Sequence, residues 1–252
     1  MKTRDLYEAL KTPRPPIEWL IEEWIGTSGL HLIAGAPKTG KSLLMAQMAL
    51  AIGSGEPTLF LQRRLKRARI LLLELEGSES SLLSRMTRIA TERDLPISRG
   101  EVTFAVRPDL VLPRDIERLR DVVEETGAEA LFIDPLAMIS PGMAENDSGA
   151  MVALMHALGE IAKERAIILL AHTSKPPAVR SSDEARDPFH SIRGSSALFG
   201  AVDSAAILET TTPDGLLARL IIRPRDAKRS TIDLERGVDS LRWQPSQRGI
   251  AA

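Results

Sequence analysis

The chain has 252 residues with 33 basic and 34 acidic side chains, a formal net charge of -1, and no cysteine. A chain of this length buries a core without disulfides or structural zinc, and the lack of cysteine excludes thiolate metal sites and thiol catalysis. The near-zero charge argues against a uniformly basic nucleic-acid binder, although a local basic groove would not show in the sum. No signal peptide and no apolar run of about 18 residues is found, so we expect a cytoplasmic protein that does not enter a membrane.

The first part of the chain is predicted to be an arm. Three prolines and many charges precede an amphipathic piece at 17–29, and we assign residues 1–28 to an N-terminal arm with a short helix that serves for docking. Residues 29–244 are predicted to form one domain, and residues 245–252 a flexible tail.

Short apolar runs and helical segments alternate through the first two-thirds of the domain. Strands are predicted at 30–34, 70–76, 102–106, 130–134 and 166–171, and helices at 42–53, 80–94, 114–125 and 149–164. Such alternation implies parallel crossover units, and therefore an α/β fold with a mostly parallel central sheet flanked by helices. On the last of these helices, His156 is interpreted as a half-buried histidine rather than a metal ligand.

The helical pattern stops near residue 202. Strands at 204–209 and 217–222, separated by turn sequences, predict a C-terminal antiparallel extension of the same sheet. Two earlier stretches, 140–149 and 173–191, are rich in proline, serine and charge. Unstructured loops of that length inside a compact domain are usually functional or disordered.

The strongest motif is a phosphate-binding loop between the first predicted strand and helix: Gly35-Ala36-Pro37-Lys38-Thr39-Gly40-Lys41-Ser42. The two outer glycines allow successive amides to turn inward on a phosphate, and the following helix adds its unpaired N-terminal amides. Lys41 would neutralise the β- and γ-phosphates, and Ser42 would offer a hydroxyl to Mg²⁺. We therefore expect residues 35–43, including Leu43 on the first helical turn, to bind ATP.

Carboxylates close two of the predicted strands. Asp134 ends the run Ala-Leu-Phe-Ile-Asp and is the candidate for the metal-linked carboxylate; the alternative is a helix cap, which Pro135 opposes. The strand at 69–76 ends in Glu74 and Glu76, which would share one face of an extended strand. Glu76, at the tip, is the better candidate for the base that activates water, whereas Glu74 lies deeper and would need a partner.

Another polar cluster follows the strand at 166–171. His172 is placed where a sensor of the γ-phosphate would lie; alternatively, it caps the strand and Lys175 is solvated. Arg193, Arg223 and Arg225 are candidates to reach a phosphate in a neighbouring subunit, although isolated loop arginines are usually solvated. The basic run at 63–69 favours a charged turn over a DNA-binding patch.

Several motifs also occur in one order: GAPKTGKS, LELEGSES, LFIDPLA with ENDSGAM, LLAHTSK, and RGSSALFGAVDSAAIL. Together they resemble the RepA-type group of RecA-like ATPases, the small plasmid and phage replicative helicases related to the DnaB motor domain. The resemblance covers about residues 19–241. It implies a RecA-like P-loop NTPase core, ATP and Mg²⁺ as cofactors, and a hexameric ring with ATP between subunits.

The resemblance also assigns roles to residues. Lys41 and Ser42 would bind nucleotide and Mg²⁺, Asp134 the metal, Glu76 would activate water, and His172 would sense the γ-phosphate. Arg193, or the pair Arg223 and Arg225, would act in trans. The loops at 140–149 and 173–191 would face single-stranded DNA, with phosphate contacts from Lys175, Arg180 and Arg186. The second loop departs from a basic pattern, because it also carries Asp183, Glu184 and Asp187.

Three functions are consistent with these motifs. The favoured one is a ring-forming, Mg²⁺-dependent ATP hydrolase that moves along single-stranded DNA as a helicase in plasmid, phage or mobile-element replication, with an initiator, loader or primase as partner. The second is a RecA-like assembly switch that regulates partners without helicase activity. A small-molecule P-loop kinase is less favoured, because no lid with clustered arginines is evident.

Overall fold

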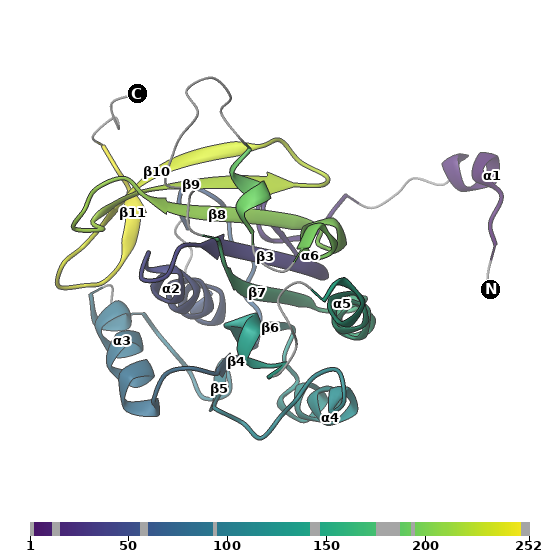
Figure 1. Cartoon of the computed structure of the whole chain (residues 1–252), viewed down its shortest axis with the longest axis horizontal. Helices are drawn as coiled ribbons and strands as arrows, with labels where there is room; N and C mark the ends of the chain where they lie inside the picture. The colour runs from purple at the N-terminus through teal and green to yellow at the C-terminus, as the bar shows by residue number, and fades with distance from the viewer. Residues whose placement is uncertain are drawn as a thin grey trace.

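The computed structural model describes residues 3–11, 16–55, 60–92, 95–141, 147–174, 187–192 and 195–247. Its centre is a sheet in which nine strands of the described chain follow the order β11-β10-β9-β8-β3-β7-β6-β4-β5 (Figure 1). The strands span β3 Gly29–Gly35, β4 Ile70–Glu74, β5 Val102–Val106, β6 Ala130–Asp134, β7 Ala166–His172, β8 Ser204–Thr210, β9 Leu217–Pro224, β10 Ser230–Arg236 and β11 Trp243–Pro245.

The sheet has a parallel half and an antiparallel half. From β5 to β8 all neighbouring strands are parallel, and from β8 to β11 they are antiparallel. Both the mostly parallel core and the C-terminal antiparallel extension are therefore confirmed. In this arrangement the carboxyl ends of β3, β4, β6 and β7 meet at one edge, which is where ligands bind in open α/β sheets.

The helices cover both faces of the parallel half. α2 Lys41–Ser54 and α3 Glu79–Thr91 lie on one face, and α4 Ile116–Thr126 and α5 Ser148–Ala162 on the other (Figure 1). Successive strand residues alternate between the two cores: Ile33 and Phe132 pack with α2, whereas Leu32 and Leu131 pack with α5. This alternation explains why the strands read as continuous apolar runs, since both faces of a parallel sheet are buried.

All four predicted helices are confirmed, and their ends differ from the prediction by one to three residues. The short helix α6 Ser195–Ala201 and the 3-10 helices η1 Leu136–Met138 and η2 Pro188–Ser191 were not predicted, because each is too short for a periodic pattern. The prediction of a half-buried His156 was wrong. Its side chain is exposed, because the buried stripe of α5 runs through Met151, Leu154, Met155, Leu158, Ile161 and Ala162.

The N-terminal segment contains a short helix, α1 Leu6–Lys11, none of whose residues is buried and which lies away from the rest of the molecule (Figure 1). The amphipathic piece after it forms a hairpin of β1 Trp19–Ile21 and β2 Ile25–Gly26. Leu20, Ile21, Trp24 and Ile25 of this hairpin join the core beneath α2. The hairpin is thus part of the same hydrophobic core as the sheet. Among the described residues, no helix is long and apolar enough to cross a membrane.

Candidate nucleotide-binding site

The loop between β3 and α2 has the backbone that its glycines predict. Gly40 adopts a φ of 87° and Lys38 a φ of 64°, both in the left-handed region. A Cβ at Gly35 would lie 2.5 Å from the carbonyl oxygen of Leu208, and a Cβ at Gly40 would lie 2.8 Å from the ring of Trp243. Any larger residue at either position would therefore displace a neighbouring strand or the loop itself.

Lys41 lies at the start of α2 and is buried against this loop. Its Nζ donates to the carbonyl of Ala36 at 2.7 Å, and the Thr39 hydroxyl donates to the same oxygen at 2.9 Å. Burial lowers the pKa of Lys41 to about 8, and the nearby charges of Asp134 and Glu76 oppose that shift. The ammonium thus remains mostly charged at neutral pH inside a partly dry loop, where it can neutralise a bound phosphate.

The two predicted metal-linked residues lie together. The Ser42 hydroxyl donates a hydrogen bond to the buried carboxylate of Asp134 at the end of β6. Burial raises the pKa of Asp134 to about 6, the Ser42 hydrogen bond opposes this shift, and the charge of Glu74 adds to it. Asp134 caps no helix, because η1 begins after Pro135 and lacks a side-chain cap.

The oxygen donors at this position fit Mg²⁺. A hydroxyl and a carboxylate are ligands that this cation accepts, and Mg²⁺ usually takes its other ligands from water and substrate phosphates. In the described part of the chain, no group of three or more His, Asp or Glu side chains could hold a metal ion without such help. Ser42 and Asp134 therefore suit a cation that arrives with a nucleotide.

The carboxylates after β4 are arranged differently from the prediction. The strand ends at Glu74, not Glu76, and residues 75–77 form a bend, so the two glutamates do not share a strand face. Glu74 is buried and pairs with Arg85 at 2.6 Å, which is the partner that its depth required. The Glu76 side chain is exposed, yet its negative charge acts to raise the pKa of both Lys41 and Asp134. Its function as the base remains a prediction.

His172 is the last residue of β7, directly beside the loop. It pairs in register with Gly35, and the next amide, of Thr173, donates to the Gly35 carbonyl at 3.1 Å. The side chain of His172 is half-buried. The structure thus places this residue next to the first glycine of the motif, while its function as a sensor remains a prediction.

The two described arginine candidates already have partners within the chain. Arg223 forms two bonds with Asp187, at 2.7 and 2.8 Å, and stacks on Phe189 with 4.1 Å to the ring centroid. Arg225 pairs with Asp203 at 3.0 Å and has 56% of its side chain exposed, against 21% for Arg223. Arg193 and the proposed DNA contacts Lys175, Arg180 and Arg186 lie outside the described residues.

Four of the five basic side chains in the run at 63–69 bind neighbouring acceptors. Lys66 pairs with Glu18 at 2.6 Å, Arg67 with Glu101, and Arg69 with Glu129 at 3.7 Å. Arg63 donates to the Glu22 carbonyl and to the Ser230 hydroxyl. This arrangement agrees with a charged turn rather than a free basic patch.

Sequence reasoning missed the residues that support the loop from outside. The indole Nε1 of Trp243 donates to the Gly40 carbonyl at 3.2 Å. Gln47 of α2 exchanges two bonds of 2.9 Å with the backbone of Trp243, one from each partner. A glutamine in the middle of an apolar helix is a signal that could have been noticed, because such a buried amide needs partners.

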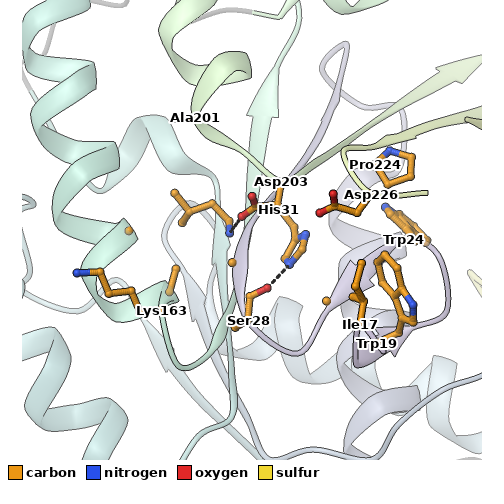
Figure 2. Close-up of a pocket in the computed structure, with 15 residues that line it drawn as sticks. Ile17, Trp19, Trp24, Ser28, His31, Lys163, Ala201, Asp203, Pro224 and Asp226 are labelled. Carbon is orange, nitrogen blue, oxygen red and sulfur yellow. Dashed lines mark hydrogen bonds between the residues drawn. The ribbon is translucent and has the colours of Figure 1, made fainter. Parts of the chain in front are cut away.

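A cavity of about 460 Å³ lies at the other end of β3, away from the phosphate loop. Its lining includes Trp19, Trp24, Asp203, Asp226 and the buried His31, whose Nε2 lies 3.3 Å from the Ser28 carbonyl (Figure 2). The Nδ1 of His31 contacts the Ser204 hydroxyl at 2.9 Å. Because Gly29 and Leu30 open β3 here, this cavity is separate from the nucleotide-binding site.

A strand, a glycine loop and a helix with a buried lysine and a Ser-Asp pair define a P-loop nucleotide-binding domain. The chain belongs to the AAA domain family, which matches residues 2–178. A search of the curated proteins finds none that matches the sequence.

Two solved structures are similar to the whole domain. One is the ATPase domain of G40P, with a TM-score of 0.67, 16% identity and 96% coverage of both chains. The other is a DnaB-like replicative helicase, solved to show its interactions with primase, with a TM-score of 0.68, 16% identity, and coverage of 96% of this chain and 67% of that chain. At this identity the likeness establishes the fold, and it confirms the predicted RecA-like core.

Proposed function

We propose that the chain is a Mg²⁺-dependent ATPase motor. The observation that carries this proposal is the buried Lys41 beside the Ser42-Asp134 pair at the carboxyl edge of the sheet. In this proposal, the loop amides and Lys41 hold the β- and γ-phosphates, and Ser42 and Asp134 hold Mg²⁺. Bound Mg²⁺ would neutralise part of the negative charge of the phosphates.

The chain's own residues would complete the hydrolytic site. Glu76, exposed in the bend at 75–77, orients the attacking water and accepts its proton. His172, which pairs in register with Gly35, senses the γ-phosphate from the end of β7. A neighbouring subunit in a ring, hexameric by resemblance, supplies an arginine to the transferring phosphoryl group.

We further propose that the motor is a replicative helicase acting on single-stranded DNA in the cytoplasm. The support is the ordered set of motifs and the shared fold with the ATPase domain of G40P and with a DnaB-like replicative helicase. The second of these structures concerns interactions with primase, so a primase, loader or initiator is the kind of protein partner to expect.

The test is the rate of ATP hydrolysis by the assembled protein with and without single-stranded DNA. We expect DNA to raise the rate, and the stimulation to fall between about 50 and 200 mM salt, because phosphate contacts release counterions. The mass of the assembly is measured under the same conditions. A ring that hydrolyses ATP but neither binds nor responds to DNA would refute the helicase function.

One observation favours the alternative of a nucleotide-dependent assembly switch. Four of the five basic side chains in the run at 63–69 are bound to acceptors of the same chain, namely Arg63, Lys66, Arg67 and Arg69, and the overall charge is only -1. In that case ATP would control assembly or capture of a protein partner, and DNA would change neither property. The same measurements separate the two functions.

A further inference from the structure

The carboxylate of Glu74 connects two separate parts of the site. One oxygen accepts from the amide of Gly77 at 2.9 Å, and the other accepts from Arg85 of α3 at 2.6 Å. Glu74 is 4% exposed, so this charge is almost dry. Arg85 is itself held, because its Nε donates to the Ser81 carbonyl at 3.3 Å. We call Glu74 and Arg85 the bracket.

The bracket fixes the bend that carries Glu76. On one side of Glu76, the amide of Leu75 donates to the Asp134 carbonyl at 2.8 Å. On the other side, the Gly77 amide is bound by Glu74. Both neighbours of Glu76 are therefore anchored, one to the strand that carries Asp134 and one to the bracket.

Gly77 and the Glu74 carboxylate are in close contact. A Cβ at Gly77 would lie 2.9 Å from the carboxyl carbon of Glu74, closer than real contacts allow. The Glu74 carboxylate occupies the space next to the bend that a side chain at position 77 would need. The fit indicates that the hydrogen bond to Glu74 is a built feature of the bend.

Stability alone does not account for a charged pair at this position. Burying an ion pair costs desolvation energy that its attraction often fails to repay, and apolar residues of similar volume are frequently as stable. The other residues of β4 are apolar and buried. The charged pair lies at the one end of the strand that faces the phosphate loop, with Asp134 directly opposite Glu74 in register.

We infer that Glu74 and Arg85 are positioning residues, which hold the bend at 75–77 and thereby keep the Glu76 carboxylate directed at the phosphate loop. The catalytic part of this inference rests on the proposed ATPase function. The structural part, that Glu74 holds the Gly77 amide, can be measured independently.

The experiment compares four variants of the full chain. Glu74→Leu removes the acceptor, Glu74→Gln keeps an oxygen for the Gly77 amide, and Gly77→Ala disturbs the contact from the other side. The control is Arg88→Met, since Arg88 is also on α3 but donates to the carbonyls of Val238 and Asp239 and does not touch the bracket. For each variant we measure kcat, KM for ATP, and hydrogen exchange of the Gly77 amide.

We expect Glu74→Leu and Gly77→Ala to lower kcat about 10- to 100-fold, the cost of a misplaced catalytic group, while KM for ATP changes less than about threefold. In Glu74→Leu the Gly77 amide should exchange roughly tenfold faster, as loss of one hydrogen bond predicts. Glu74→Gln keeps an acceptor for the Gly77 amide but cannot also accept from Arg85, so exchange should stay slow while kcat falls less than in Glu74→Leu. Arg88→Met should match the natural chain in both.

Two results would overturn the inference. One is an unchanged Gly77 exchange rate in Glu74→Leu; the other is faster exchange with unchanged kcat, which would make the bracket purely structural. If Glu74→Leu does not fold, Gly77→Ala decides by the same kcat criterion. If the natural chain does not hydrolyse ATP at all, the proposed function fails, while the exchange measurement still decides whether the bracket holds the bend.

Discussion

Gly40 and Trp243 are in direct contact although they are 203 residues apart in the sequence, and the indole donates to the glycine carbonyl at 3.2 Å. The same ring occupies the space that a Cβ at position 40 would need. The phosphate loop is therefore supported from behind by the last strand of the sheet. Gln47 closes the arrangement by binding both backbone groups of Trp243.

This contact predicts that Trp243 contributes to nucleotide affinity. In Trp243→Phe the ring remains but the indole donor is lost, and we expect affinity for ATP to fall about three- to tenfold, the usual value of one hydrogen bond. Trp243→Ala should lower the free energy of unfolding by about 3–5 kcal/mol, because it empties a fully buried site. Nucleotide titration and urea unfolding measure the two effects. Trp19→Phe, in the N-terminal hairpin, is the control and should bind ATP normally.

Substitutions of Lys41 and of Glu76 should impair ATP binding and hydrolysis in different ways. Lys41→Ala removes the buried charge of the phosphate loop, so hydrolysis should be abolished and ATP binding weakened. Glu76→Gln leaves that loop intact, so ATP should bind with near-normal affinity while turnover falls by about 100-fold or more. Single-turnover kinetics together with binding titration separates the two. Near-normal hydrolysis by Glu76→Gln would assign the base to another residue.

Asp134 should destabilise the nucleotide-free chain. Its pKa is raised to about 6 in the folded protein from an ordinary 3.8. The folded chain then binds the proton more tightly than the unfolded chain, so stability falls as pH rises from about 4 to about 6 and stays low above that. Asp134→Asn should therefore be more stable at about pH 7.5, by up to about 3 kcal/mol, yet lose Mg²⁺-dependent turnover. A variant less stable than the natural chain at that pH would contradict the prediction.

His31 should have the opposite effect on how stability depends on pH. Burial lowers its pKa to about 4 from 6.5, while Asp203 and the Ser28 carbonyl oppose the shift. The unfolded chain then binds the proton more readily, so stability is lost as pH falls from about 6.5 to about 4, by up to about 3 kcal/mol. Asp134 titrates over an overlapping pH range and changes stability in the opposite direction. A plot of total stability against pH would therefore not show either contribution separately.

The variant His31→Gln isolates this contribution, because it keeps hydrogen-bonding groups but does not titrate. Urea unfolding at a series of pH values should show the natural chain losing stability relative to the variant below about pH 6.5. Parallel pH curves for the two proteins would show that His31 is not the group responsible.

The exposed Arg225 is the better of the two described candidates for an arginine acting in trans. Arg225→Gln should slow hydrolysis by the assembly at least about 100-fold with little change in stability or ATP affinity. Arg223→Gln should chiefly lower the free energy of unfolding, by about 1–3 kcal/mol, because it leaves Asp187 without its partner. Arg193→Gln is measured in parallel, and a selective loss of turnover in that variant alone would assign the role to Arg193.

The sheet and its main helices were predictable because local pattern and final structure agree. The buried strands are continuous apolar runs, and each predicted helix follows a loop with capping or glycine residues, such as Ser78 before α3 and Asp147 before α5. The phosphate loop was predictable for the same reason, since Gly35 and Gly40 have local geometric roles.

The rest depends on contacts between distant segments. The hairpin at Trp19–Gly26 has an amphipathic sequence that suits a helix, but its apolar side chains are buried as strands under α2. The β4 strand stops at Glu74 because that side chain turns to bind Gly77 and Arg85. The partners of Arg223 and Trp243 lie 36 and 196 residues away, which no local pattern records.

The contact between Gly40 and Trp243 also sets the order in which the site matures during synthesis. The motif leaves the ribosome long before the strand that supports it, because 203 residues separate the two partners. A nascent chain would therefore carry the complete motif without a finished binding surface. ATP added during translation should rescue few early intermediates, whereas it should protect the chain strongly once the final strand has joined the sheet.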